Sequence, residues 1–240
     1  MEPTVDANAS ENASENAVRP AGAAGFVLDG IREAILSGEF VPNQRLVEAD
    51  LSEQFVASRA AVRTALLQLA HEGLVERVQN RGARVRAVSL AEAIEICEVR
   101  MVLEGLCAAK AAERITAAEG VELDGIGAAM CAAVSAGDVL GYSRLNERLH
   151  RRVREIGAQR TAATVLERLR AQSVRHQFRL AMQPGRPTES LPEHLAIIAA
   201  IRANDPRAAE LAVHAHLRSV IHALAGAEEH TGAANGRDSS

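Results

Sequence analysis

The sequence predicts a mainly α-helical protein in which a small α+β unit precedes an all-helical domain. The chain is 48% hydrophobic, largely through alanine and leucine, but only 2% aromatic. Alanine and leucine favour helices, whereas β-branched and aromatic residues favour sheets. One strand-like pair, residues 74–79 and 83–87, flanks the hairpin turn signal Asn80-Arg81-Gly82. At 240 residues the chain can form two modest domains with cores of their own.

The predicted boundary between the two domains lies at residues 86–89, where strand gives way to continuous helix. Ser89 with Glu92 forms a capping box, and so does Thr116 with Glu119, while Asp205-Pro206 is an N-cap followed by proline. Helices are predicted near 90–113, 117–135, 138–156, 160–182, 192–203 and 206–225. Residues 1–21 and 226–240 are small, polar and repetitive, which predicts disordered tails around domains 22–88 and 89–225.

The first domain is predicted to contain three helices followed by a two-stranded hairpin. A helix from 25 to 37 ends at Gly38, and a short helix covers 48–55. After a tight turn, Ser58 is a suitable N-cap for a third helix that ends before Gly73. Helix, helix, turn, helix and hairpin within about 65 residues is the order of a winged helix-turn-helix.

The charge distribution of this domain fits a nucleic-acid partner better than the net charge of −4 does. Between residues 58 and 86 there are six arginines and two glutamates, a local balance of +4. Arg59 and Arg63 share one helix face, about a quarter turn from the apolar stripe, so both can enter a major groove. Arg81 and Gly82 at the hairpin tip could approach the backbone or minor groove. The alternative is a solvated arginine face.

The stretch from Leu51 to Val85, LSEQFVASRAAVRTALLQLAHEGLVERVQNRGARV, together with Arg45-Leu46 resembles the DNA-binding head of GntR-family regulators. The resemblance covers about residues 25–88. Its departures are Asn43, where a glycine is usual, and alanines at 57, 60 and 61; the alanine at 60 could remove a DNA contact. The family's contacting arginines carry over to Arg45, Arg59 and Arg63, and its wing glycine to Gly82. The predicted DNA-binding set is Arg45, Ser58, Arg59, Arg63, Arg81 and Gly82.

Three histidines stand out in the helical domain. His150 follows Asn146 by four residues, so both project from one face of a helix. His194 shares a stripe with isoleucines, and either His214 or His216 borders the next apolar stripe. Three imidazoles and an amide oxygen that converge in a bundle would suit Zn²⁺, Ni²⁺, Mn²⁺ or Fe²⁺. The alternative is that each histidine is an ordinary core residue.

The same domain is similar to the FCD domain, the effector domain of one GntR subfamily. The matching segments are Val99-Arg100-x-x-Leu103-Glu104, Asn146-x-x-x-His150, Glu193-His194-x-x-Ile197 and Ala212-Val213-x-x-His216-Leu217. The resemblance implies an antiparallel helical bundle that often holds a divalent metal by one Asp and three His. Here the implied ligands are Asn146, His150, His194 and His216, with Asn146 replacing the usual aspartate. Arg100 is a candidate partner for an effector carboxylate, the alternative being an Arg100–Glu104 pair within the helix.

These features together predict a ligand-responsive transcription regulator, a repressor, that acts as a homodimer on a pseudo-palindromic double-stranded DNA operator. Its expected effector is a small carboxylate. The sequence shows no secretory signal and no apolar run long enough to span a bilayer, so we expect a cytoplasmic protein without a membrane partner. Two alternatives are an architectural DNA binder with a purely structural bundle and a metal-dependent enzyme. Glu147-x-x-His150 supplies only half of a di-iron site, so we expect no enzyme.

Overall fold

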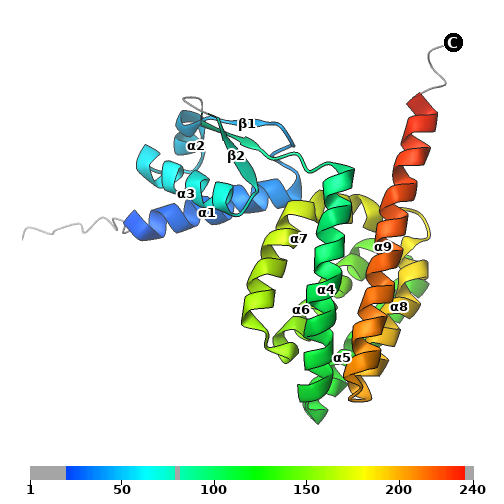
Figure 1. Ribbon diagram of the computed structural model, residues 1–240. Coiled ribbons are helices and arrows are strands. Elements are labelled where there is room, and N and C mark those ends of the chain that lie inside the picture. The colour runs from blue at the N-terminus through cyan, green and yellow to red at the C-terminus, as the bar shows by residue number, and fades with distance from the viewer. Residues whose placement is uncertain (1–19, 79–81, 236–240) are drawn as a thin grey trace, which may run out of the picture.

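The structure, a computed structural model, describes residues 20–78 and 82–235. Figure 1 shows a small N-terminal head, with helices around a short sheet, and a larger bundle of long helices. The head contains α1 (Pro20–Ser37), β1 (Arg45–Leu46), α2 (Glu48–Gln54), α3 (Arg59–His71), β2 (Val75–Val78) and β3 (Gly82–Val85). The bundle contains α4 (Leu90–Arg114), α5 (Ala117–Ala136), α6 (Val139–Gly157), α7 (Arg160–Ala181), α8 (Arg186–Arg202) and α9 (Pro206–Asn235).

The sheet of the head has three strands rather than the predicted two. β3 lies in the middle and pairs antiparallel with both β2 and β1, with Val75 opposite Val85 and Arg45 opposite Arg84. A strand of two residues is too short to show the alternating pattern by which strands are predicted. Of the predicted hairpin tip, Arg81 lies outside the described residues, and Gly82 begins β3.

Helix α3 forms as its sequence predicts and packs the head together. The Ser58 hydroxyl accepts a hydrogen bond from the backbone N–H of Ala61 (3.2 Å) and so caps the helix. Farther along the same helix, Val62 and Leu69 are fully buried and pack in one cluster with Val27 and Ile31 of α1. Burying an aliphatic side chain of this size contributes roughly 1.5–3 kcal/mol to the stability of the fold. This contact therefore holds α3 in place against α1.

In the bundle, α4 runs away from the head and α9 returns antiparallel beside it (Figure 1). The predicted capping box at the start of α5 is present: the Thr116 hydroxyl accepts from the Glu119 backbone N–H, and Glu119 accepts from the Thr116 backbone N–H. The core between these helices includes Leu123, Ile201 and Leu217, all fully buried. This packing holds the inward faces of α4, α6, α8 and α9 around one interior.

Three predicted helix ends are wrong. Helix α1 begins at Pro20, five residues before its predicted start at 25 and inside the segment predicted as a disordered tail. Helix α8 begins at Arg186, not at 192, because Gly185 in the left-handed region (φ 83°) precedes it and Pro187 lies in its first turn. Pro192 lies inside the helix, although the prediction placed the helix start there. Helix α9 continues to Asn235, ten residues past its predicted end at 225 and into the segment predicted as a disordered tail. Within 20–78 and 82–235, no helix is both long and apolar enough to cross a membrane.

Candidate metal and effector site and DNA-binding surface

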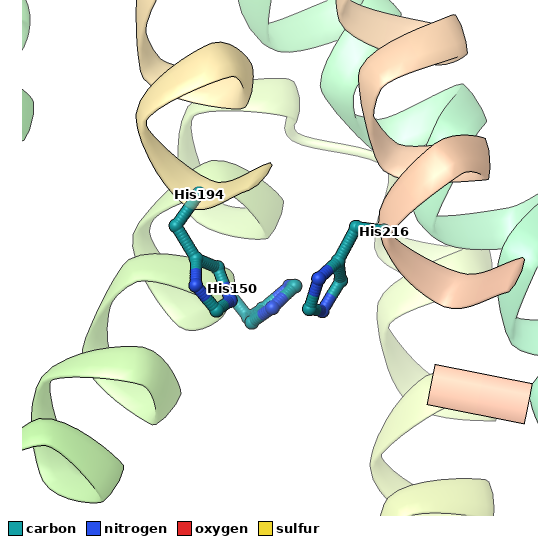
Figure 2. A group of neighbouring side chains, drawn as sticks. All are labelled: His150, His194 and His216. Carbon is teal, nitrogen blue, oxygen red and sulfur yellow. The ribbon is translucent and has the colours of Figure 1, made fainter. Parts of the chain in front are cut away.

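Three of the four predicted metal ligands meet in the centre of the bundle. His150 comes from α6, His194 from α8 and His216 from α9, and Figure 2 shows their rings facing one another. One ring nitrogen from each lies within 4.8 Å of those of the other two. All three side chains are buried. The spacing is small enough for a single ion to reach all three imidazoles.

The outward-facing nitrogen of each of these imidazoles is held by a polar side chain. The three Nδ1 contacts are His150 to Glu104 Oε2 (2.9 Å), His194 to the Tyr142 hydroxyl (2.9 Å) and His216 to Glu193 Oε2 (2.8 Å). The remaining nitrogen of His194, Nε2, is buried and has no hydrogen-bond partner. The His194 and His216 contacts are hydrogen bonds, and His150 lies at ion-pair distance from its carboxylate. Metal-binding histidines are typically oriented by such outer contacts, which raise their basicity and fix the ring. An unpartnered inward nitrogen is therefore what a metal ligand requires.

Burial keeps at least two of these rings neutral. Desolvation lowers the pKa of His150 to about 4 and lowers the pKa of His194 well below its ordinary value. Burial also opposes ionisation of Glu104, but Arg100, His150 and Arg170 together more than offset this and hold the pKa of that carboxyl well below its usual range. Neutral imidazoles oriented by ionised carboxylates can bind a cation without first losing a proton.

Asn146 lies one helical turn before His150 and lines the same cavity as the histidines. Its amide oxygen is buried and has no hydrogen-bond partner among the residues that the structure describes. A buried polar atom without a partner is costly unless water or an ion satisfies it. Three imidazole nitrogens and one free amide oxygen fit a divalent metal of the mixed nitrogen and oxygen kind.

His214, which periodicity alone could not separate from His216, lies elsewhere. A Cβ atom built on Gly105 of α4 would come within 2.6 Å of its Nε2, so the His214 ring packs against the α4 backbone at that glycine. His214 is therefore a natural control for the three clustered histidines.

A cavity of about 70 Å³ adjoins the histidine cluster, enough for roughly five waters at about 15 Å³ each, or for a small ligand. Arg100 lines it as predicted, but also makes the alternative contact within α4, with its Nε 2.9 Å from Glu104 Oε1. Sequence reasoning missed Tyr142, Arg170 and Arg186, which also line the cavity.

The spacing of polar residues on α7 could have revealed Arg170. Arg170, Ser173 and Gln177 follow at intervals of three and four, and they share the helix face of the buried Leu166 and Leu180. Polar side chains on a buried stripe mark a polar interior. Arg186 had no such signal, because it was placed in the loop before α8.

Four of the six predicted DNA-binding residues lie on one hollowed face of the head; Ser58 is not among its lining residues, and Arg81 is outside the described residues. Arg45, Arg59, Arg63 and Gly82 line it together, and Arg77 of β2, which was not predicted as a contact, joins them. Arg63 donates to Glu48 of α2, with Nη2 2.9 Å from Oε2. The first turn of α3 and the wing therefore present arginines to the same space, as major-groove binding requires.

Gly82 has a structural role that the sequence interpretation did not include. Its φ of +86° is in the left-handed region, and a Cβ atom there would lie 2.5 Å from the Leu46 carbonyl oxygen. The glycine therefore allows β1 to pair with β3.

Helix α7 joins the bundle to the head. Arg168 donates to the His71 carbonyl (2.5 Å) and Gln172 to the Glu72 carbonyl (2.9 Å), both at the C-terminal end of α3. Arg175 and His176 of the same helix contact the backbone carbonyls of Phe40 (2.6 Å) and Val88 (2.8 Å). One helix thus carries both a cavity residue, Arg170, and the contacts that hold α3.

Comparison with known proteins agrees with both parts of the molecule. The model described as "Bacterial regulatory proteins, gntR family" matches residues 23–85, and the FCD domain model matches residues 95–219. The transcriptional repressor RspR of Escherichia coli is 26% identical over 79% of this chain and 83% of its own length. A probable repressor of a D-xylose utilization operon in Paenarthrobacter nicotinovorans is 28% identical over 83% of this chain and 87% of its own length.

Solved structures share the fold. Escherichia coli McbR/YncC has a TM-score of 0.72 at 21% identity, covering 86% of this chain and 98% of the other. A GntR regulator from Rhodococcus sp. RHA1 has a TM-score of 0.66 at 20% identity, covering 85% of this chain and 98% of the other. With the winged head, the arginine-lined face and both family models in agreement, the chain belongs to the GntR family of DNA-binding transcriptional regulators, in the group that carries an FCD domain.

Proposed function

We propose that this chain is a cytoplasmic, ligand-responsive repressor whose FCD domain binds a small organic acid together with a divalent metal. The observation that supports this most is the histidine cluster: three buried imidazoles, each oriented through Nδ1, beside the unpartnered Asn146 oxygen. The metal, held by His150, His194, His216 and Asn146, would act as a Lewis acid toward an effector oxygen. Repression is proposed because two of the relatives above are named as repressors.

The neutral Asn146 has a consequence for the metal. An amide oxygen compensates less of the ion's charge than the usual aspartate would, so the bare site should hold metal less firmly. An anionic effector that approached the ion would supply the missing charge. Metal and effector are therefore expected to bind cooperatively, each raising the affinity for the other by the same factor.

The effector signal is proposed to reach DNA through α7. Arg170 of α7 lines the cavity, and Gln172 and Arg168 of the same helix donate to the last carbonyls of α3. A ligand that displaced Arg170 would move the groups that hold the C-terminal end of the DNA-reading helix. In a homodimer on a pseudo-palindromic operator, a small rotation of each head changes the spacing of the two reading helices.

The metal proposal is tested by elemental analysis of protein purified without chelator or affinity metal. We expect about one divalent ion per chain in the parent and in His214→Ala, and none retained in His194→Ala. Both substitutions remove an imidazole from the bundle, but only His194 belongs to the cluster. Equal metal content in the two variants would contradict the assignment.

The regulatory proposal needs an operator, which selection from a random duplex pool would supply. Mass spectrometry of molecules released from the purified protein would identify a co-purifying acid. Addition of that acid should change operator affinity; an architectural DNA binder with a structural bundle would show no change.

A further inference from the structure

The cavity beside the histidines is lined by cations and by no carboxylate. Arg100, Arg170 and Arg186 are among its lining residues, and no Asp or Glu is, within the part of the chain that the structure describes. Two carboxylates, Glu104 and Glu193, stand behind the histidines they hold. The cavity itself therefore presents positive groups to any ligand.

The arginines lie on two separate arms of the site. On one arm, Arg100 and Arg170 face Glu104, which holds His150. On the other, Arg186 faces Glu193, which holds His216. The first arm belongs to α4 and α7 and leads to His150, whereas the second belongs to α8 and leads to His216. A ligand that satisfies both must carry two anionic groups.

Each arm keeps one donor unsatisfied. Arg170 Nη1 and Arg186 Nη2 are buried without a hydrogen-bond partner, and their carboxylates lie 3.9 and 3.6 Å away, beyond hydrogen-bond distance. Arg100, in contrast, is bonded to Glu104 at 2.8–2.9 Å. Burial, together with repulsion by the neighbouring Arg100, lowers the pKa of Arg170 to about 10. Arg170 and Arg186, rather than Arg100, therefore each have a donor available to a ligand.

The net positive charge around the cavity also favours a ligand with two anionic groups. The three cavity arginines against the two glutamates that contact the histidines leave one positive charge, and a divalent ion would bring this to three. Glu189 also lies 3.6 Å from Arg186 Nη1, but its side chain is 69% exposed, so solvent screens its charge. Asn146 contributes no negative charge. A monocarboxylate would leave two of these charges uncompensated in a buried site, which is costly.

We propose that the effector is a short-chain dicarboxylate, with one carboxylate on Arg170 and the other on Arg186. This rests on the proposed function, because it names the class of acid that the same site binds. An inorganic phosphate carries its charge on one centre and could satisfy only one arm. The short chain follows from the cavity volume of about 70 Å³.

The test is isothermal titration and thermal shift of the metal-loaded, full-length protein with succinate, glutarate, acetate, butyrate and phosphate at constant ionic strength. We expect succinate or glutarate to bind at least about tenfold more tightly than acetate, since each charged hydrogen bond contributes about one to two powers of ten. Arg170→Gln and Arg186→Gln should each reduce this ratio about tenfold or more. Arg207→Gln, an exposed arginine paired with Glu210, should leave it unchanged.

Arg186 also donates to Ser219, so its glutamine variant could fold poorly; Arg186→Lys keeps the charge and should retain most of the preference. Three outcomes would contradict the dicarboxylate proposal: equal binding of acetate and succinate, tighter binding of phosphate, or an unchanged ratio in both glutamine variants. Each would leave the broader proposal, that the protein senses an acid, standing. If no acid or phosphate shifts the melting temperature, acid sensing fails and the dicarboxylate fails with it.

Discussion

The head and the bundle assemble their functional surfaces in opposite ways. The described arginine-lined face of the head uses residues from Arg45 to Gly82, a single stretch of sequence folded on itself. The cavity of the bundle uses residues from Arg100 to Val220, drawn from five helices. The first arrangement leaves a local pattern of spacing and caps in the sequence. The second depends on how helices that are distant along the chain pack together.

The largest effect should come from the backbone of the wing. Gly82→Ala should destabilise the protein by about 3 kcal/mol, because a positive φ costs about 1–2 kcal/mol and the Cβ overlap with Leu46 adds to it. Gly38→Ala is the matched control: its φ is +88°, but a Cβ there meets nothing within 4 Å, so only the dihedral cost applies. Urea denaturation would measure both, and equal losses would show that the β1 contact does not matter.

Next, Arg63→Ala should weaken operator binding by about 1–3 kcal/mol, the range for one lost bidentate contact, and leave the fold intact. Arg63 is exposed and pairs with Glu48 at the surface, so truncation creates no cavity. Arg207→Ala, an exposed arginine of the bundle, should leave affinity unchanged. Fluorescence anisotropy with a labelled operator would compare them. Equal affinities for Arg63→Ala and Arg207→Ala would remove Arg63 from the DNA-binding surface.

In the bundle, Glu104→Gln should lower metal affinity about 10–100-fold, the usual cost of losing an outer partner of a metal-bound histidine. The change removes the carboxylate that orients His150 while the three imidazoles stay in place. Glu113→Gln, an exposed glutamate paired with Lys110, is the control. Competition with a chelating dye would measure the metal affinities. Equal metal affinities for the two variants would show that the Glu104 carboxylate does not support metal binding.

The smallest effect tests the connection between the two regions. Gln172→Ala removes the hydrogen bond to the Glu72 carbonyl and should cost about 0.5–1.5 kcal/mol of stability. It should also reduce the change in operator affinity caused by the effector. Gln159→Ala, at the start of α7 with no capping hydrogen bond, should preserve that change. Full effector response in Gln172→Ala would exclude this contact from the coupling.

The same contrast explains what could be predicted from sequence. Caps, apolar stripes and turn glycines are local, so α3, its Ser58 cap and the α5 capping box followed from the sequence. The clustered histidines lie on apolar stripes, but their convergence was implied only by the family resemblance.

Long-range contacts had no such signal. The β1 strand has two residues, and Arg186 entered the cavity only because α8 begins six residues earlier than predicted. The contacts from α7 to the head join residues about 90 to 135 apart in sequence, which no local period can reveal.

Occupancy of the histidine site is proposed to control operator binding by the head. The most direct measurement is operator affinity with and without a saturating dicarboxylate for metal-loaded parent, His194→Ala and His214→Ala. We expect a change of about fivefold or more in the parent and in His214→Ala, within the usual range of coupling free energies, and no change in His194→Ala. The same operator affinity with and without acid in all three proteins would contradict the account and leave a DNA-binding head on a structural bundle.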